Sequence, residues 1–116
     1  MELVNYTYKL KEYLQMLREE FEKNNPPEDR KDKKFFQMVK QNTLPIYDLL
    51  EKWEELALKV VKERKISVHP NQITSTRENM ELLLMHSYYI DVRRKRYMEL
   101  NQSVSYVLDQ LLREIV

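Results

Sequence analysis

The chain has 116 residues, of which 42% are hydrophobic and 34% are charged, with 20 lysines and arginines against 19 acidic residues. This length fits one domain that buries its own core. The near balance of charge excludes a global field that would favour nucleic acid or an anionic membrane. Neither glycine nor cysteine occurs, which excludes glycine-cradled phosphate motifs, disulfide frameworks, thiol catalysis and cysteine-based zinc sites.

Residues 2–24 place apolar side chains at every third or fourth position, and this spacing predicts one amphipathic helix. Its core-facing stripe consists of Leu3, Tyr6, Leu10, Tyr13, Leu17 and Phe21. Pro26 and Pro27 end the helix, because a proline disfavours helical geometry in the residue before it. Glu28 and Asp29 follow, as is typical of acidic residues at the start of a new helix.

A second helix is predicted over about residues 28–64, with the charged run 30–34 as its solvated opening. Its core-facing stripe consists of Phe35, Phe36, Val39, Thr43, Ile46, Leu50, Trp53, Ala57 and Val60. Pro45 lies inside this stripe and removes one backbone donor. Because the apolar phase is the same on both sides of Pro45, we expect one helix kinked near that residue rather than two separate helices.

Residues 65–74 are predicted to form a linker, because His69 precedes Pro70 and a residue before proline is biased towards extended backbone. Capping or turn formation accounts for His69. Ser75 and Glu78 have the spacing of a capping box, and an apolar run follows them. The third helix is therefore predicted to begin at Ser75.

From Ser75 to Val116 the pattern is helical without any proline. One straight helix of this length would be about 60 Å long, so we expect two helices joined by a turn in the polar stretch 91–96. The stripe of the last helix consists of Tyr97, Leu100, Val104, Leu108, Leu111 and Ile115. The predicted fold is an all-α, antiparallel up-and-down four-helix bundle that occupies residues 1–116 as one domain. One continuous C-terminal helix that mediates dimerisation is the alternative.

The motifs of metal-binding helical bundles are missing from the sequence. Only two histidines occur, His69 and His86, and the residues three positions before them are Ile66 and Leu83, so the Glu-x-x-His motif of di-iron bundles is absent. A zinc site would need three or four ligands. We therefore predict no metal, no cofactor and no catalytic residue.

The densest polar and aromatic stretch of the chain lies between residues 86 and 97 and supplies a candidate binding surface. Its members are His86, Tyr88, Tyr89, Asp91, Arg93 and Arg94. On a continuous helix Asp91 would pair with Arg94 or Lys95, and Arg93 would stack on Tyr89. A solvated turn with salt bridges is the favoured interpretation, and an anion or phosphate site is the alternative.

Within this stretch, His86 is interpreted as a histidine at the edge of the core, hydrogen-bonded to a tyrosine or a carboxylate. A general base or ligand contact is its alternative role. Nucleic-acid binding is disfavoured, because the four consecutive basic residues 93–96 point around the whole helix and do not form one basic face.

Three segments together resemble a known family: Trp53-Glu54-Glu55-Leu56-Ala57-Leu58, the linker Val68-His69-Pro70, and the stretch from Ser75 to Glu81 followed by His86 to Arg93. The chain resembles the YppE-like family of small uncharacterised proteins from bacilli and their relatives, over essentially its whole length. The resemblance implies an up-and-down four-helix bundle in a bacterial cytoplasm. It brings no activity, cofactor or catalytic residue with it.

Two functional hypotheses follow from these patterns. The first is a non-enzymatic interaction module that binds another protein or a second copy of itself, since six of the eight tyrosines lie on or beside the predicted stripes and suit a partner interface. The second is a small-ligand or anion-binding protein or enzyme with a pocket around His86 and Arg93, with Arg77 or Glu78 as further members. No run of about 18 apolar residues occurs and no secretory signal precedes the first helix, so we expect a cytoplasmic location without membrane contact.

Overall fold

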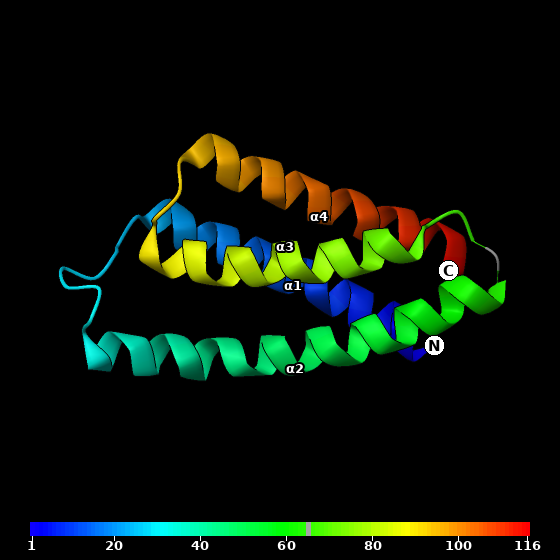
Figure 1. Cartoon of the computed structure of the whole chain (residues 1–116), viewed down its shortest axis with the longest axis horizontal. Coiled ribbons are helices and arrows are strands. Elements are labelled where there is room, and N and C mark those ends of the chain that lie inside the picture. Colours follow the sequence, from blue (N-terminus) through cyan, green and yellow to red (C-terminus); the bar gives the residue numbers. More distant parts are fainter. Residues whose placement is uncertain (65) are drawn as a thin grey trace.

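A computed structural model describes residues 1–64 and 66–116 of the chain. It contains four helices, α1 (Glu2–Lys23), α2 (Lys33–Arg64), α3 (Pro70–Tyr89) and α4 (Arg94–Ile115). The helices alternate in direction along the longest axis of a molecule that measures 48 × 27 × 20 Å (Figure 1). This arrangement confirms the predicted antiparallel up-and-down bundle.

The four helices are not equivalent in the bundle. α1 and α3 each contact the three other helices, whereas the described residues of α2 and α4 do not approach one another. α1 and α3 therefore form the central pair, and Figure 1 shows α2 and α4 on opposite sides of it. The loops 24–32 and 90–93 lie together at one end, which we call the loop end, and among the helices α2 extends furthest at this end (Figure 1).

The predicted stripes supply most of the buried core. In the last helix all six predicted core residues are buried, and in the second helix every predicted residue from Val39 to Val60 is buried. In α1 the buried positions include Thr7 and Leu14, whereas Tyr6 and Tyr13 are only half-buried. The phenol rings lie at the border of the core because their polar tips favour water.

Trp53 and Thr7 make the most deeply buried polar contact between helices. The Trp53 indole N–H donates to the Thr7 hydroxyl across 3.1 Å, and that hydroxyl donates to the backbone carbonyl of Leu3 across 2.6 Å. Neither Trp53 nor Thr7 has any exposed surface. The threonine in the α1 stripe thus satisfies a donor that would otherwise be buried without a partner.

α2 continues through Pro45 as one helix, as the unbroken apolar phase predicts. The predicted kink near Pro45 stays a prediction. Pro45 has no N–H to donate to the carbonyl four residues earlier, on Gln41. Both residues are exposed, so water can hydrogen-bond to that carbonyl. The helix therefore tolerates a proline that would be much more costly on its buried face.

The predicted start of the third helix at Ser75 is wrong. α3 begins five residues earlier at Pro70, with His69 as its N-cap. The His69 side chain accepts from the Asn71 amide across 3.0 Å, and the Gln72 side chain accepts from the His69 amide across 2.8 Å. A proline is well suited to the first helical position, so this earlier capping box starts the helix and the predicted linker is shorter.

Residues 75–116 form two helices, and the alternative of one continuous helix is wrong. α3 ends at Tyr89, and Ile90 follows with φ 52° and ψ 46°, in the left-handed region. Its amide donates to the carbonyl of His86 across 3.0 Å and closes the helix end. The predicted turn at 91–96 is correct in place but too long, because α4 already begins at Arg94. None of the helices, over their described residues, is long and apolar enough to cross a membrane.

Candidate functional site

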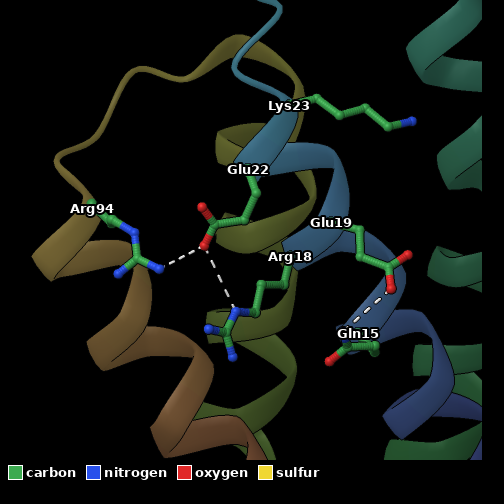
Figure 2. A pocket seen from close by; sticks show the side chains of 6 residues that line it. All are labelled: Gln15, Arg18, Glu19, Glu22, Lys23 and Arg94. Carbon is green, nitrogen blue, oxygen red and sulfur yellow. Dashed lines mark hydrogen bonds and ion pairs between the residues drawn. The ribbon is translucent and has the colours of Figure 1, made fainter.

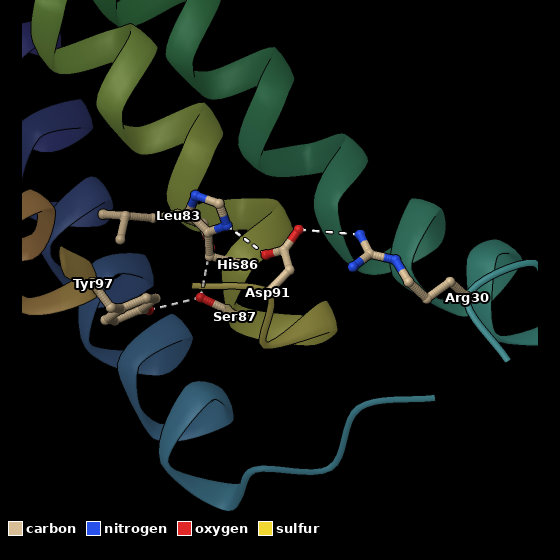
Figure 3. Close-up of polar contacts among 6 residues, drawn as sticks. All are labelled: Arg30, Leu83, His86, Ser87, Asp91 and Tyr97. Atoms are coloured by element: carbon tan, nitrogen blue, oxygen red, sulfur yellow. Dashed lines mark hydrogen bonds and ion pairs between the residues drawn. The ribbon is translucent and has the colours of Figure 1, made fainter. Parts of the chain in front are cut away.

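The predicted surface contains a three-residue polar cluster at the loop end. His86 Nδ1 lies 2.6 Å from Asp91 Oδ1, and Arg30 Nη2 donates to the other carboxylate oxygen, Oδ2, across 3.2 Å (Figure 3). The side chains of His86 and Asp91 are 19% and 26% exposed. The left-handed turn at Ile90 brings Asp91 back beside the last turn of α3, which confirms the interpretation of His86 as a core-edge histidine bound to a carboxylate.

The same contacts control the ionisation of Asp91. Burial opposes its negative charge, but the hydrogen bonds from His86 and Arg30 outweigh this effect and hold the pKa of Asp91 below its ordinary value. The ionised carboxylate therefore joins two loops that are 61 positions apart in the sequence. This arrangement can clamp the loop end.

Aromatic contacts reinforce this clamp. The ring of Phe35, in the first turn of α2, meets the ring of Tyr89 edge-on with 5.2 Å between centroids. The Arg30 guanidinium carbon lies 5.8 Å from the centroid of the same Tyr89 ring, close enough for a cation–π attraction. Arg30, which the sequence suggested only as part of a solvated helix opening, therefore belongs to the cluster.

Two expected contacts within the predicted surface are wrong. Asp91 pairs with His86 and Arg30, not with Arg94 or Lys95. The ring of Tyr89 is met by Arg30, not by Arg93, which is the N-cap of α4. Both expectations assumed helical spacing, and the break at Ile90 removes it.

Arg94 lies in a different group of charges, between α1 and α4. Its Nη2 donates to Glu22 Oε1 across 2.7 Å, and Arg18 Nε lies 3.8 Å from the same oxygen (Figure 2). These residues line an open, shallow depression with mixed charge, whose members are Gln15, Arg18, Glu19, Glu22, Lys23 and Arg94. Because Glu22 already lies between the two guanidinium groups, an incoming anion would have to compete with it.

Tyr88 and its neighbour Ser87 belong to the interior. Tyr88 is buried, and burial raises the pKa of its phenol, although a hydrogen bond with Asn42 opposes the shift. The Ser87 hydroxyl donates to the Leu83 carbonyl across 2.6 Å, so its 2.7 Å contact with Tyr97 uses the phenol as donor (Figure 3). The Tyr97 ring is fully buried and stacks on Phe21 at 3.9 Å, and burial raises the pKa of Tyr97 to about 12.

The six predicted surface residues are therefore divided among several environments. His86, Tyr89 and Asp91 lie together, Tyr88 is buried, Arg94 pairs with α1, and Arg93 is an exposed cap. The two further candidates lie apart as well, since Arg77 pairs with Glu54 at 2.9 Å and with Glu81 at 3.4 Å, and Glu78 is exposed. The described residues bring together no group of three or more side chains that could hold a metal ion.

A second surface, which the sequence did not suggest, runs along the boundary between α2 and α3. We call it the α2–α3 seam. On each helix its members recur at intervals of three or four and so share one face. They are Phe36, Lys40, Leu44 and Tyr47 on α2, and Leu82, Met85 and Tyr89 on α3.

Two pairs of side chains fix the antiparallel register of the seam. Phe35 meets Tyr89, and Glu54 meets Arg77. Tyr47 lies on α2 between these two pairs, where burial raises its pKa and the negative charge of Glu81 adds to the shift. By this register Leu44 is level with Leu82 and Met85, and Phe36 is level with the last turn of α3.

The fold and these contacts define a small antiparallel four-helix bundle whose polar clusters connect its own helices and loops. The chain belongs to the family described as a bacterial domain of unknown function (DUF1798), whose family model matches residues 7–115. It is 32% identical over 82 residues to the uncharacterized protein YppE of Bacillus subtilis (strain 168), a match that covers 70% of this chain and 67% of that protein. The resemblance inferred from the sequence is confirmed.

Solved structures of YppE from Bacillus subtilis have the same fold. Its crystal structure matches 98% of this chain and 92% of its own, with a TM-score of 0.80 and 26% identity. Its solution NMR structure matches 100% of this chain and 97% of its own, with a TM-score of 0.73 and 25% identity. The family has no assigned function, so the surfaces of this chain must suggest one.

Proposed function

We propose that this protein is a non-enzymatic interaction module of the bacterial cytoplasm and that it binds a partner protein through the α2–α3 seam. One observation carries this proposal. Phe36, Leu44 and Leu82 are 49%, 47% and 45% exposed, although each belongs to one of two adjoining helices that bury other faces in the core. Large apolar side chains grouped on one surface are typical of a binding site.

The neighbours of these three residues extend the apolar surface. Tyr47, Met85 and Tyr89 lie on the same faces and are half-buried. Aromatic residues and methionine are enriched in protein interfaces. The seam therefore has the composition of an interface, with a phenol ring at either end and aliphatic side chains between.

The shape of the bundle makes the seam accessible. α2 is longer than α3 by twelve residues, at 32 against 20, and its N-terminal turn extends past the other helices at the loop end (Figure 1). Phe36 lies in this first turn, where about half of its side chain is exposed. A partner can cover it without disturbing the core beneath.

Site-specific photo-crosslinking in the host bacterium tests the proposal. A photoreactive phenylalanine analogue is placed at Phe36, and in a matched variant at Tyr106, which is 62% exposed on α4. We expect a discrete crosslinked protein from position 36 that position 106 does not give and that the substitution Leu44→Glu removes. Circular dichroism should show that Leu44→Glu folds normally, because exposed substitutions change stability by only about 0.5 kcal/mol.

The mass of the crosslinked product identifies the occupant. A product of twice the chain mass would indicate a second copy, and any other mass a different protein. The same products from both positions, or none from position 36, would contradict the seam as the binding surface.

A further inference from the structure

We infer that the segment bound at the seam is an amphipathic helix that carries acidic residues beside its apolar stripe, and that Lys33 and Lys40 pair with those carboxylates. This inference rests on the proposed function and specifies the chemistry of its partner. It follows from the distribution of charge along α2, from the contacts of the lysines and from the geometry of the seam.

The N-terminal half of α2 is basic without compensation. Lys33, Lys34 and Lys40 are exposed, and no acidic residue occurs in α2 before Asp48. Among the described residues these three lysines form no ion pair. The whole chain carries a formal net charge of only +1, so this local excess is not a property of a generally basic protein.

Two of these three lysines, Lys33 and Lys40, lie on the same face of α2 as the exposed apolar residues of the seam. Lys40 is one turn from both Phe36 and Leu44 on the same face of α2, and Lys33 is one turn before Phe36. The helix N-terminus itself is already satisfied, because Asp32 Oδ1 accepts from the amides of Lys34 and Phe35 across 2.9 and 3.2 Å. Lysine side chains, not free amides, therefore attract the partner.

The seam also has an electrostatic direction. The acidic residues within α2 and α3 that adjoin the seam, Glu51, Glu78 and Glu81, all lie at the level of Tyr47 or beyond it, away from the loop end. At the loop end, the carboxylates of Asp32 and Asp91 are already held by the α2 amides and by His86 and Arg30. A partner helix with acidic residues along its whole length would be repelled by the three glutamates. Its carboxylates must therefore gather at the end that covers Phe36 and Leu44, which fixes the direction in which it binds.

A helix fits this surface better than an extended segment does. Phe36 and Leu44 are separated by about 12 Å along α2, which two turns of a second helix span with side chains at positions i, i+3 or i+4 and i+7. The described chain has no strand, so it offers no sheet edge to which an extended peptide could add.

The test uses a defined probe, a synthetic helical peptide of about 18 residues. One face carries leucines at helical spacing, and glutamates flank them at one end; a matched peptide has glutamine in place of each glutamate. Fluorescence anisotropy measures binding to the full chain, to the variant Lys33→Glu/Lys40→Glu, and to Lys52→Glu, an exposed lysine on another face of α2.

We expect the glutamate peptide to bind the full chain, with affinity that falls as salt rises. The double variant should weaken binding by about tenfold or more, and Lys52→Glu should change it much less. Leu44→Glu should also abolish binding. Loss of peptide binding at every salt concentration, equal binding of the glutamine peptide, or equal effects of the double variant and Lys52→Glu would overturn the inference.

Two competing partners are measured in the same assay. Tighter binding to phosphatidylglycerol vesicles or to duplex DNA than to the peptide, with the same dependence on Lys33 and Lys40, would overturn the acidic helix. Failure of the inference about the acidic helix can be distinguished from failure of the proposed function. If crosslinks from position 36 persist and depend on Leu44 but not on the lysines, the interaction role stands and only the chemistry of the partner is wrong.

Discussion

The indole N–H of Trp53 reaches from α2 to the hydroxyl of Thr7 on α1, 3.1 Å away, where both side chains are completely buried. Thr7→Val keeps the shape of the side chain and removes the acceptor, which leaves a buried donor unsatisfied. We expect a loss of about 1–3 kcal/mol in the free energy of unfolding, measured by urea denaturation.

Thr43 provides a matched control for this substitution. It is also buried and also donates to a carbonyl four residues earlier, on Val39, but its hydroxyl accepts no hydrogen bond from another described side chain. Thr43→Val should therefore cost less than about 1 kcal/mol. Equal losses for the two variants would show that Trp53 does not depend on Thr7.

Tyr97 should make the protein sensitive to alkali. Its pKa is about 12 in the folded chain against an ordinary value of 10.0, so the unfolded chain loses the phenolic proton first. The contribution of Tyr97 to the free energy of unfolding is fully present below pH 10. As the pH rises towards 12, about 2–3 kcal/mol of it is lost. Urea unfolding of the protein and of Tyr97→Phe across this range should show a shallower decline in the variant; parallel curves would contradict the assignment.

Asp91 should make the protein sensitive to acid, whereas Tyr97 makes it sensitive to alkali. Its pKa lies below the ordinary value of 3.8 in the folded chain, so its contribution is present above that value and is lost as pH falls through the folded pKa. Asp91→Asn should cost about 1 kcal/mol at neutral pH, and the difference from the unsubstituted chain should shrink in acid. Asp48→Asn, at an exposed position of α2, should show no such loss.

Replacing each of the two helical prolines, Pro45 and Pro70, with alanine should affect stability differently. Pro45 lies in the interior of α2, where the carbonyl of Gln41 lacks its usual donor. Pro45→Ala should raise the free energy of unfolding by about 1–3 kcal/mol. Pro70 occupies the first position of α3, where a missing N–H costs nothing, so Pro70→Ala should bring no gain. A thermal melt of each variant distinguishes the two cases.

The periodic core of the bundle could be predicted from the sequence, because an apolar stripe depends only on helical geometry. The stripe from Tyr97 to Ile115 is an example, since its burial needs no knowledge of the partner helices. The start of α3 could not be predicted in the same way. Ser75 and Glu78 have correct capping spacing, but His69 and Gln72 form a second capping box that the structure uses.

The candidate site was harder to predict, because its contacts join distant segments. Arg30 and Asp91 meet only because their loops lie at the same end of an antiparallel bundle. The predicted contacts of Arg93 with Tyr89 and of Arg94 with Asp91 were wrong, because they assumed a continuous helix. The left-handed residue Ile90 ends that helix. Phe36 was predicted as core but is 49% exposed, whereas the ring of the adjacent Phe35 packs against Tyr89, and the apolar pattern does not reveal which of the two faces α3.

Ile90 has a consequence for the order in which the chain folds. A left-handed backbone costs a β-branched residue such as Ile90 roughly 1–2 kcal/mol. Glycine would adopt this backbone without that cost, but the chain contains no glycine. Ile90 is partly buried against the core, so its own packing must compensate. The turn between α3 and α4 is therefore unfavourable until the surrounding side chains have assembled. We expect these two helices to join late, as a result of core formation and not as a hairpin that initiates it.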